Sequence, residues 1–207
     1  MREMDRNVLS AAFHVTIPVL MGYLAIGMAF GLMMDSAGYN VFWALLMSLI
    51  IYAGAGQYMG VTLLAAGASP LQTALMTLLL NFRHMFYGLS MLEKFRGMGL
   101  RKLYMIFSLT DETYALLASA KAPEGVREKD YYLAIALMDH SYWVLGTVLG
   151  SLLGSALSFD TTGVDFAMTA LFIVIAVGQW KGTRNHLPAA IGCLATLASL
   201  RLAGEVR

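Results

Sequence analysis

Apolar residues fill most of the chain, in seven blocks separated by short polar links. The blocks are residues 14–34, 41–68, 71–92, 103–120, 131–158, 166–180 and 187–200. A membrane-spanning helix needs about 20 mostly apolar residues, and most of the blocks approach or exceed that length. We therefore predict an all-α, polytopic transmembrane helical bundle with about six or seven spanning segments. The links are short, so residues 1–207 are expected to form a single integral membrane domain.

The second block is too long for one straight crossing. Its 28 residues, Val41–Ala68, would make a helix of about 42 Å, against a hydrocarbon core of about 30 Å. The sequence Gly54-Ala55-Gly56-Gln57 lies inside it. Two glycines and a glutamine there predict a discontinuous helix, whose two halves meet inside the membrane. The alternative is a tilted helix that packs closely through its glycines.

A similar but weaker glycine pattern occurs later in the sequence and favours an internal repeat. Gly27-x-x-x-Gly31 precedes the break at residues 54–57, and Gly150-x-x-x-Gly154 precedes Gly178-Gln179. Interrupted segments at matching places in two halves indicate a transporter binding site. The alternative is chance, because glycine accounts for 20 of the 207 residues.

Composition supports a membrane protein. Charged residues make up 13% of the chain, against roughly 25% in an average soluble domain, and the mean hydropathy is +0.66. Such a sequence is neither disordered nor a coiled coil, and one cysteine excludes a disulfide framework. A net charge of +1 gives no support to nucleic-acid binding. No cofactor or metal site is expected.

Three charged pairs interrupt the apolar blocks: Arg83-His84, Asp111-Glu112 and Asp139-His140. A charge at the bilayer centre costs at least about 2.5–3.5 kcal/mol, so such residues face a protein interior or a water-filled cavity. With neutral histidines the pairs carry one positive and three negative charges. A dry interior does not hold this imbalance unless protons, cations or water balance it.

These pairs therefore predict a site for a proton, a cation or the two charges of an amino acid. Arg83 is the candidate partner for a carboxylate, the acids are candidates for an ammonium group, and the histidines are proton acceptors. The predicted substrate and proton pathway consists of Gly54, Gly56, Gln57, Asn81, Arg83, His84, Asp111, Glu112, Asp139 and His140. The alternative is that the pairs lie near segment ends, with residues 103–120 forming an interfacial hairpin.

Helical spacing adds two expectations about faces. Asn81 and His84 align on one face of the third block. Asp139 shares a face with Trp143 and with a small-residue stripe formed by Gly146, Gly150 and Gly154. Small residues allow close approach of helices, so Asp139 is expected to face a neighbouring helix and not lipid.

The charges of the links leave the orientation open. Cytoplasmic loops are enriched in Lys and Arg, and Arg2 and Arg6 favour a cytoplasmic N-terminus. The links at residues 93–102 and 121–130 are also basic. They cannot both be cytoplasmic if residues 103–120 span the membrane.

Five passages form a distinctive combination: Pro18–Gly31, Ser48–Gln57, Ala66-Gly67-Ala68-Ser69-Pro70, Asn81-x-Arg83-His84-x-x-Tyr87-Gly88 and Thr110-Asp111-Glu112-x-Tyr114. Together they resemble the AzlC family of branched-chain amino acid exporters. The resemblance implies the larger subunit of a permease in the prokaryotic cytoplasmic membrane, working with a small hydrophobic AzlD-like subunit. It also implies efflux of leucine, isoleucine, valine and often methionine, or of analogues, driven by the proton motive force.

Two other classes of function compete with this reading. An intramembrane hydrolase would need its acids and histidines to converge, but neither His-Glu-x-x-His nor Gly-x-Ser-x-Gly occurs in the sequence, so we predict no enzyme. A membrane channel or a structural membrane partner predicts no role for protonation of Asp139 or His84 and no saturable flux.

Overall fold

The computed structural model describes residues 6–156 and 186–204, and the isolated positions 166, 169, 173, 177, 180 and 181. All regular structure in these residues is helical. The chain forms two compact units, residues 1–168 and 169–207. The second contains α10 (Leu187–Gly204), at the predicted seventh block. The predicted sixth block, and with it Gly178-Gln179 of the predicted repeat, lies outside the continuously described residues.

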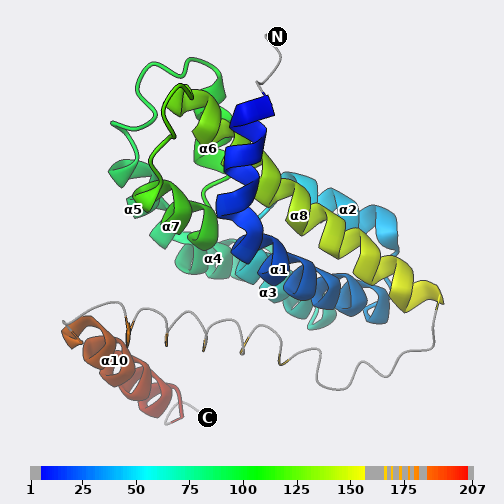
Figure 1. The fold of residues 1–207 in the computed structure, drawn as a ribbon. Coiled ribbons are helices and arrows are strands. Elements are labelled where there is room, and N and C mark those ends of the chain that lie inside the picture. Colours follow the sequence, from blue (N-terminus) through cyan, green and yellow to red (C-terminus); the bar gives the residue numbers. More distant parts are fainter. Residues whose placement is uncertain are drawn as a thin grey trace. The chain divides into compact units, whose positions relative to one another are not determined.

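Two long helices form the frame of the first unit. They are α1 (Arg6–Ser36) and α8 (Glu128–Ala156), which extend the predicted first and fifth blocks towards the N-terminus. Among the described residues, these two helices are long and apolar enough to cross a membrane. The count of six or seven spanning segments stays a prediction. The two helices lie side by side (Figure 1) and form the most extensively packed pair of helices in the unit.

The predicted stripe of small residues on α8 lies directly on the backbone of α1. A Cβ at Gly31 would collide with the backbone of Thr147 and would lie 2.5 Å from the amide nitrogen of Ser151. A Cβ at Gly150 would collide with the backbone of Met28. Gly27 of α1 lies against residues 143–147 of α8, and Gly31 lies against residues 147–151. Later residues of α1 thus contact later residues of α8, so the two helices are parallel. The prediction that this face of α8 meets a neighbouring helix is confirmed.

The second block is broken, as predicted, but the break lies just before Gly54–Gln57, and those four residues form the first turn of the next helix. The block forms α2 (Val41–Ile50) and α3 (Gly54–Ala65), joined by residues 51–53, where Tyr52 adopts a positive φ of 43°. Gln57 hydrogen-bonds to Ser48, and Gly60 of α3 lies near Met47 of α2. The two half-length helices are therefore antiparallel. Both outer ends of this α2–α3 hairpin lie near the C-terminal end of α1, and its tip points to the middle of α8.

The fourth block is not one helix, which corrects the prediction of a continuous segment at residues 103–120. It forms α6 (Arg101–Phe107) and α7 (Asp111–Ser119). Thr110 begins α7 by accepting a hydrogen bond from the Thr113 amide, which is favourable N-cap chemistry. Along α8, α6 begins beside Asp130 and α7 ends beside Tyr132. The α6–α7 hairpin therefore starts and finishes at the N-terminal end of α8.

The third block also divides, into α4 (Pro70–Asn81) and α5 (Arg83–Ser90), with Phe82 between them. A capping box of Ser69 and Gln72 begins α4. Phe82 keeps helical dihedrals at the break, and the His84 ring lies 3.1 Å from the Asn81 carbonyl, so the two residues stay close together. Asn81 lies against α3 and Arg83 contacts α7, so this broken helix connects the two hairpins.

Two apolar clusters lie at the two ends of the long helices. The first joins the N-terminal parts of α1 and α8 to the α6–α7 hairpin and includes Ala12, Phe95, Met105, Leu117 and Ile135. The second joins their C-terminal parts to the α2–α3 hairpin and includes Phe30, Met34, Tyr58, Val61 and Trp143. The tips of both hairpins lie between these clusters, where most of the buried polar side chains gather. Figure 1 shows the two hairpins at opposite ends of α1 and α8.

Candidate functional site at the hairpin tips

The tips of the two hairpins meet against the middle of α8. We define them as residues 51–53 of the α2–α3 hairpin and 108–110 of the α6–α7 hairpin. The Tyr52 ring stacks on His140 with a centroid separation of 4.1 Å, and it lies 6.1 Å from the ring of Phe107, just before the second tip. Half-helix ends that meet beside buried polar groups are the arrangement that transporters use for substrates and ions.

His140 connects three helices. Its Nε2 lies 3.1 Å from the Ser48 carbonyl of α2, and its Nδ1 lies 3.0 Å from the Tyr104 hydroxyl of α6. A carbonyl oxygen only accepts, so Nε2 carries the hydrogen and Nδ1 accepts from Tyr104 in a neutral ring. Both ring nitrogens of this predicted proton acceptor are therefore already satisfied without an added proton.

The predicted residues of the first tip attach α3 to α8. The Trp143 indole donates to the Gln57 amide oxygen at 2.9 Å, and the Gln57 amide donates to the Ser48 hydroxyl at 3.1 Å. Gln57 is fully buried, so these bonds replace water. A Cβ at Gly54 would lie 3.2 Å from the Trp143 ring, and one at Gly56 would lie 3.4 Å from the Asn81 amide. The structure therefore brings four of the predicted residues, Gly54, Gly56, Gln57 and Asn81, close together.

Arg83 already has a carboxylate partner. Its guanidinium donates to Asp111 at 2.9 Å, and the Tyr87 hydroxyl donates to the other oxygen of Asp111 at 2.6 Å. The Arg83 and Asp111 side chains are 33% and 20% exposed. A substrate carboxylate at Arg83 would therefore have to compete with Asp111. His84 lies next to this pair, with its ring edge-on to Tyr87.

A chain of hydroxyl groups joins the other two acids. Glu112 accepts from Tyr23 at 2.9 Å, and Tyr23 lies 2.6 Å from the hydroxyl of Thr110. Thr110 donates to Thr113 at 3.0 Å, and Thr113 donates to Asp139 Oδ2 at 2.8 Å. Sequence reasoning missed the three hydroxyl residues. The two threonines flank Asp111-Glu112 and offered a signal, whereas Tyr23 lies unmarked in an apolar block.

Asp139 is the most deeply enclosed of the predicted acids. It is 0% exposed, and its Oδ1 has no hydrogen-bond partner. The Tyr52 hydroxyl lies close enough to interact with Asp139, Thr113 and Tyr23, but it makes no hydrogen bond of normal geometry. None of the ion pairs in residues 6–156 includes Asp139. A buried carboxylate oxygen in this condition is costly unless a ligand or a proton occupies it.

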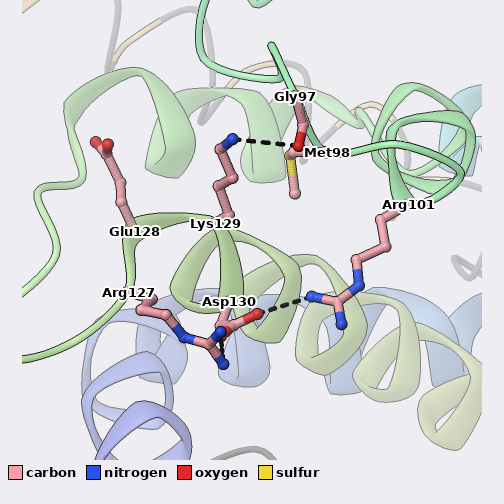
Figure 2. Close-up of a pocket in the computed structure, with 7 residues that line it drawn as sticks. All are labelled: Gly97, Met98, Arg101, Arg127, Glu128, Lys129 and Asp130. Atoms are coloured by element: carbon pink, nitrogen blue, oxygen red, sulfur yellow. Dashed lines mark hydrogen bonds and ion pairs between the residues drawn. The ribbon is translucent and has the colours of Figure 1, made fainter. Parts of the chain in front are cut away.

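A separate pocket of about 480 Å³ lies at the N-terminal end of α8, away from the tips. Figure 2 shows Asp130 between Arg101 and Arg127, with Lys129 donating to the Gly97 carbonyl. Asp130 is buried and bonded to both arginines. The pocket contains none of the predicted site residues. In the described part of the chain, no group of three or more His, Cys, Asp or Glu side chains is arranged to hold a metal ion.

Comparisons with known proteins give the relatives of this chain. The AzlC protein family matches residues 18–157. The branched-chain amino acid transport protein AzlC of Bacillus subtilis is 40% identical over 194 residues, which cover 94% of this chain and 76% of that protein. A membrane protein of Helicobacter pylori strain 26695 is 47% identical over 93% of this chain and 85% of its own. The inner membrane protein YgaZ of Escherichia coli K12 is 33% identical over 91% and 81%. No solved structure matches.

Proposed function

This chain belongs to the AzlC protein family, and we propose that it is the large subunit of a permease that exports branched-chain amino acids. Leucine, isoleucine, valine and methionine are the proposed substrates. The proton motive force drives export, and a small AzlD-like membrane protein completes the transporter. The name of the Bacillus subtilis relative supports the substrate class, and two relatives named as membrane proteins support a place in the prokaryotic cytoplasmic membrane.

The distribution of basic residues supports one orientation. Because the α6–α7 hairpin returns to the end at which it starts, both basic links lie at the same end as the start of α1. The basic residues at this end are Arg6, Lys94, Arg96, Arg101, Lys102, Lys121, Arg127 and Lys129. The links at the opposite end, residues 37–40 and 66–69, contain neither Lys nor Arg. The positive-inside rule therefore places the start of α1 and α8 in the cytoplasm.

Cysteine labelling in whole cells tests this orientation. In a Cys193→Ser background, Ala66→Cys reports the end between α3 and α4, and Lys121→Cys reports the basic end. A membrane-impermeant maleimide is expected to label Ala66→Cys in intact cells and Lys121→Cys only after the membrane is opened. The reverse pattern would overturn the orientation, and labelling of both in intact cells would overturn the two-sided arrangement.

The substrate site lies at the hairpin tips, and one observation carries this proposal: the buried Oδ1 of Asp139 has no partner. An amino-acid ammonium group supplies the hydrogen bonds and the positive charge that this oxygen lacks. The N-terminus of α3 supplies a place for the substrate carboxylate. Ala53 provides no side-chain cap there, and the first turn contains no acid. Free helix amides and the positive end of the helix dipole favour an anion.

Transport by purified protein tests the function. Proteoliposomes that contain the chain, with and without its companion, are loaded with labelled leucine and given an imposed pH gradient. Saturable, gradient-driven flux that requires both proteins is the expected result. Flux that is neither saturable nor sensitive to the gradient would indicate a channel, and absence of leucine and methionine flux with both proteins present would overturn the proposal.

Substrate analogues test the two halves of the site separately. Leucinamide lacks the carboxylate and 4-methylpentanoate lacks the ammonium group. Asp139→Asn is expected to weaken leucine and leucinamide binding about tenfold or more, because a charge-assisted hydrogen bond is lost, and to leave 4-methylpentanoate unaffected. The matched control, Asp35→Asn, removes a carboxylate at the far end of α1. Equal effects of the two variants would contradict an ammonium site at Asp139.

A further inference from the structure

The chain of hydroxyls between Glu112 and Asp139 is one hydrogen short. It contains four oxygen–oxygen contacts: Glu112 with Tyr23, Tyr23 with Thr110, Thr110 with Thr113, and Thr113 with Asp139. The three hydroxyl groups supply one hydrogen each, and an ionised carboxylate supplies none. With both acids ionised, one of the four contacts brings two oxygen atoms together with no hydrogen between them.

Ionised carboxylates only accept, so Tyr23 donates to Glu112 and Thr113 donates to Asp139. Thr110 then has one hydrogen for two contacts. When it donates to Thr113, the 2.6 Å contact between Tyr23 and Thr110 has no hydrogen. A contact of this length between two hydroxyl oxygens is a normal hydrogen bond only when a hydrogen lies between them. One additional proton on either terminal acid lets the hydroxyls reorient and completes all four bonds.

We propose that Glu112 and Asp139 hold one proton in common, and that the hydroxyls of Tyr23, Thr110 and Thr113 carry it between them. When Glu112 releases its proton to Tyr23, each hydroxyl passes its own hydrogen to the next oxygen, and Asp139 Oδ2 receives the last one. One O–H bond breaks and one forms at each hydroxyl. The net change is the transfer of one proton and one unit of negative charge between α7 and α8.

The other titratable and charged groups near the chain of hydroxyls have other partners or lie outside it, so the two acids are the groups that hold the shared proton. Tyr52 of the first hairpin tip lies beside Asp139, Thr113 and Tyr23, but its hydroxyl makes no hydrogen bond of normal geometry. Tyr104 of α6 bonds to the neutral ring of His140, which in turn bonds to the Ser48 carbonyl. The nearby charges are Arg83 of α5 and Asp111 of α7, which form an ion pair. Asp139 Oδ1, fully buried and without a partner, marks the end of the chain at which a ligand approaches.

This one-proton site deepens the proposed function and rests on it for its role in transport. Arrival of a substrate ammonium at Asp139 Oδ1 favours the ionised form of Asp139, so the shared proton moves to Glu112. Departure of the substrate lets the proton return. Substrate and proton therefore compete for Asp139. Coupling of export to the proton motive force then requires Glu112 to exchange the displaced proton with water.

Infrared spectroscopy of the full chain in lipid nanodiscs tests the site without any substrate. A protonated carboxyl gives a carbonyl band that is separate from that of carboxylates. Either Asp139→Asn or Glu112→Gln is expected to abolish this band, because the amide NH₂ supplies the missing hydrogen to the chain. The matched control, Asp111→Asn, is expected to keep it. A band that is lost in only one of the two variants, or in neither, would overturn sharing.

Isotope labelling gives a second reading that does not depend on those variants. In the wild-type protein, ¹³C in the aspartate carboxyls and ¹³C in the glutamate carboxyls are each expected to shift part of the same band. In Tyr23→Phe, which breaks the chain, only one label is expected to shift it, whereas Tyr58→Phe removes a buried hydroxyl outside the chain and keeps both shifts. A wild-type band that responds to one label alone contradicts the proposal. The result is independent of leucine flux, so failure of the site and failure of the exporter are distinguishable.

Discussion

The α1–α8 pair and the hairpin tips are built on opposite principles. Gly31 and Gly150 bring the backbones of the two long helices into direct contact, with no room for a single added carbon atom. The tips are held mainly by side-chain hydrogen bonds, and two buried polar atoms there, Tyr52 Oη and Asp139 Oδ1, have no partner. Close backbone packing resists rearrangement, whereas an incomplete polar network has another bonding state available. We therefore expect the long helices to act as the scaffold and the tips to be the part that responds to a ligand.

The two tips also differ from each other. Thr110 caps α7, and Asp111 and Glu112 in its first turn complement the positive end of its helix dipole. The N-terminus of α3 follows Ala53 and has neither a side-chain cap nor an acid in its first turn. One half-helix thus satisfies its own N-terminus, while the other leaves its N-terminus open. This contrast supports the roles proposed above, with Glu112 of α7 in the proton site and the end of α3 as the place for the substrate carboxylate.

The largest effect is expected from a single methyl group in the scaffold. Gly31→Ala places a carbon against the backbone of Thr147 and Ser151, and backbone cannot move aside as a flexible side chain can. We expect a loss of about 3 kcal/mol in stability. Gly22→Ala is the matched control in the same helix, because its Cβ meets nothing within 4 Å, and it should stabilise α1 slightly. Thermal unfolding in detergent measures both, and equal effects would refute the backbone contact.

A smaller loss is expected at the first tip. Gln57→Leu keeps the volume but leaves the Trp143 indole without an acceptor in a buried place, which should cost about 2–3 kcal/mol. Gln72→Leu, at the exposed start of α4, is the control and should cost well under half as much. The same unfolding measurement applies. If the two variants unfold alike, Gln57 does not attach α3 to α8.

The sequence predicted the scaffold better than the tips. Helical spacing was sufficient to find the stripe of small residues on α8. Glycine content predicted that the second block breaks, but it placed the break at Gly54–Gln57, and the structure has it at residues 51–53. At residues 103–120 the sequence left a spanning segment and a hairpin as alternatives, because 18 mostly apolar residues look the same whether they cross a membrane or turn back halfway. The role of Tyr23 in the site was missed for a related reason. A tyrosine in an apolar block carries no sign that its hydroxyl will meet Thr110, a residue 87 positions away.

A substitution at the capped tip, at the start of α7, is expected to reduce stability less than Gln57→Leu does. Thr110→Ala removes the N-cap of α7 and two links of the hydroxyl chain, at a cost of about 1–2 kcal/mol. Ser69→Ala, which removes the N-cap of α4 outside the site, should cost about 1 kcal/mol. The two variants should differ in transport activity. Thr110→Ala is expected to lose proton-driven leucine flux while Ser69→Ala keeps it, and retained flux in both would remove Thr110 from the proton path.

The smallest change in stability is expected at the open tip, and it has the opposite sign. Ala53→Ser gives α3 the cap that it lacks, and this should stabilise the protein by about 0.5–1 kcal/mol. The same hydroxyl then occupies the amides that the substrate carboxylate would use. Leucine should therefore bind several-fold more weakly, whereas leucinamide, which has no carboxylate, should bind as before. Calorimetric titration of both ligands measures the difference. A variant that is more stable and binds leucine unchanged would show that the open end of α3 does not receive the carboxylate.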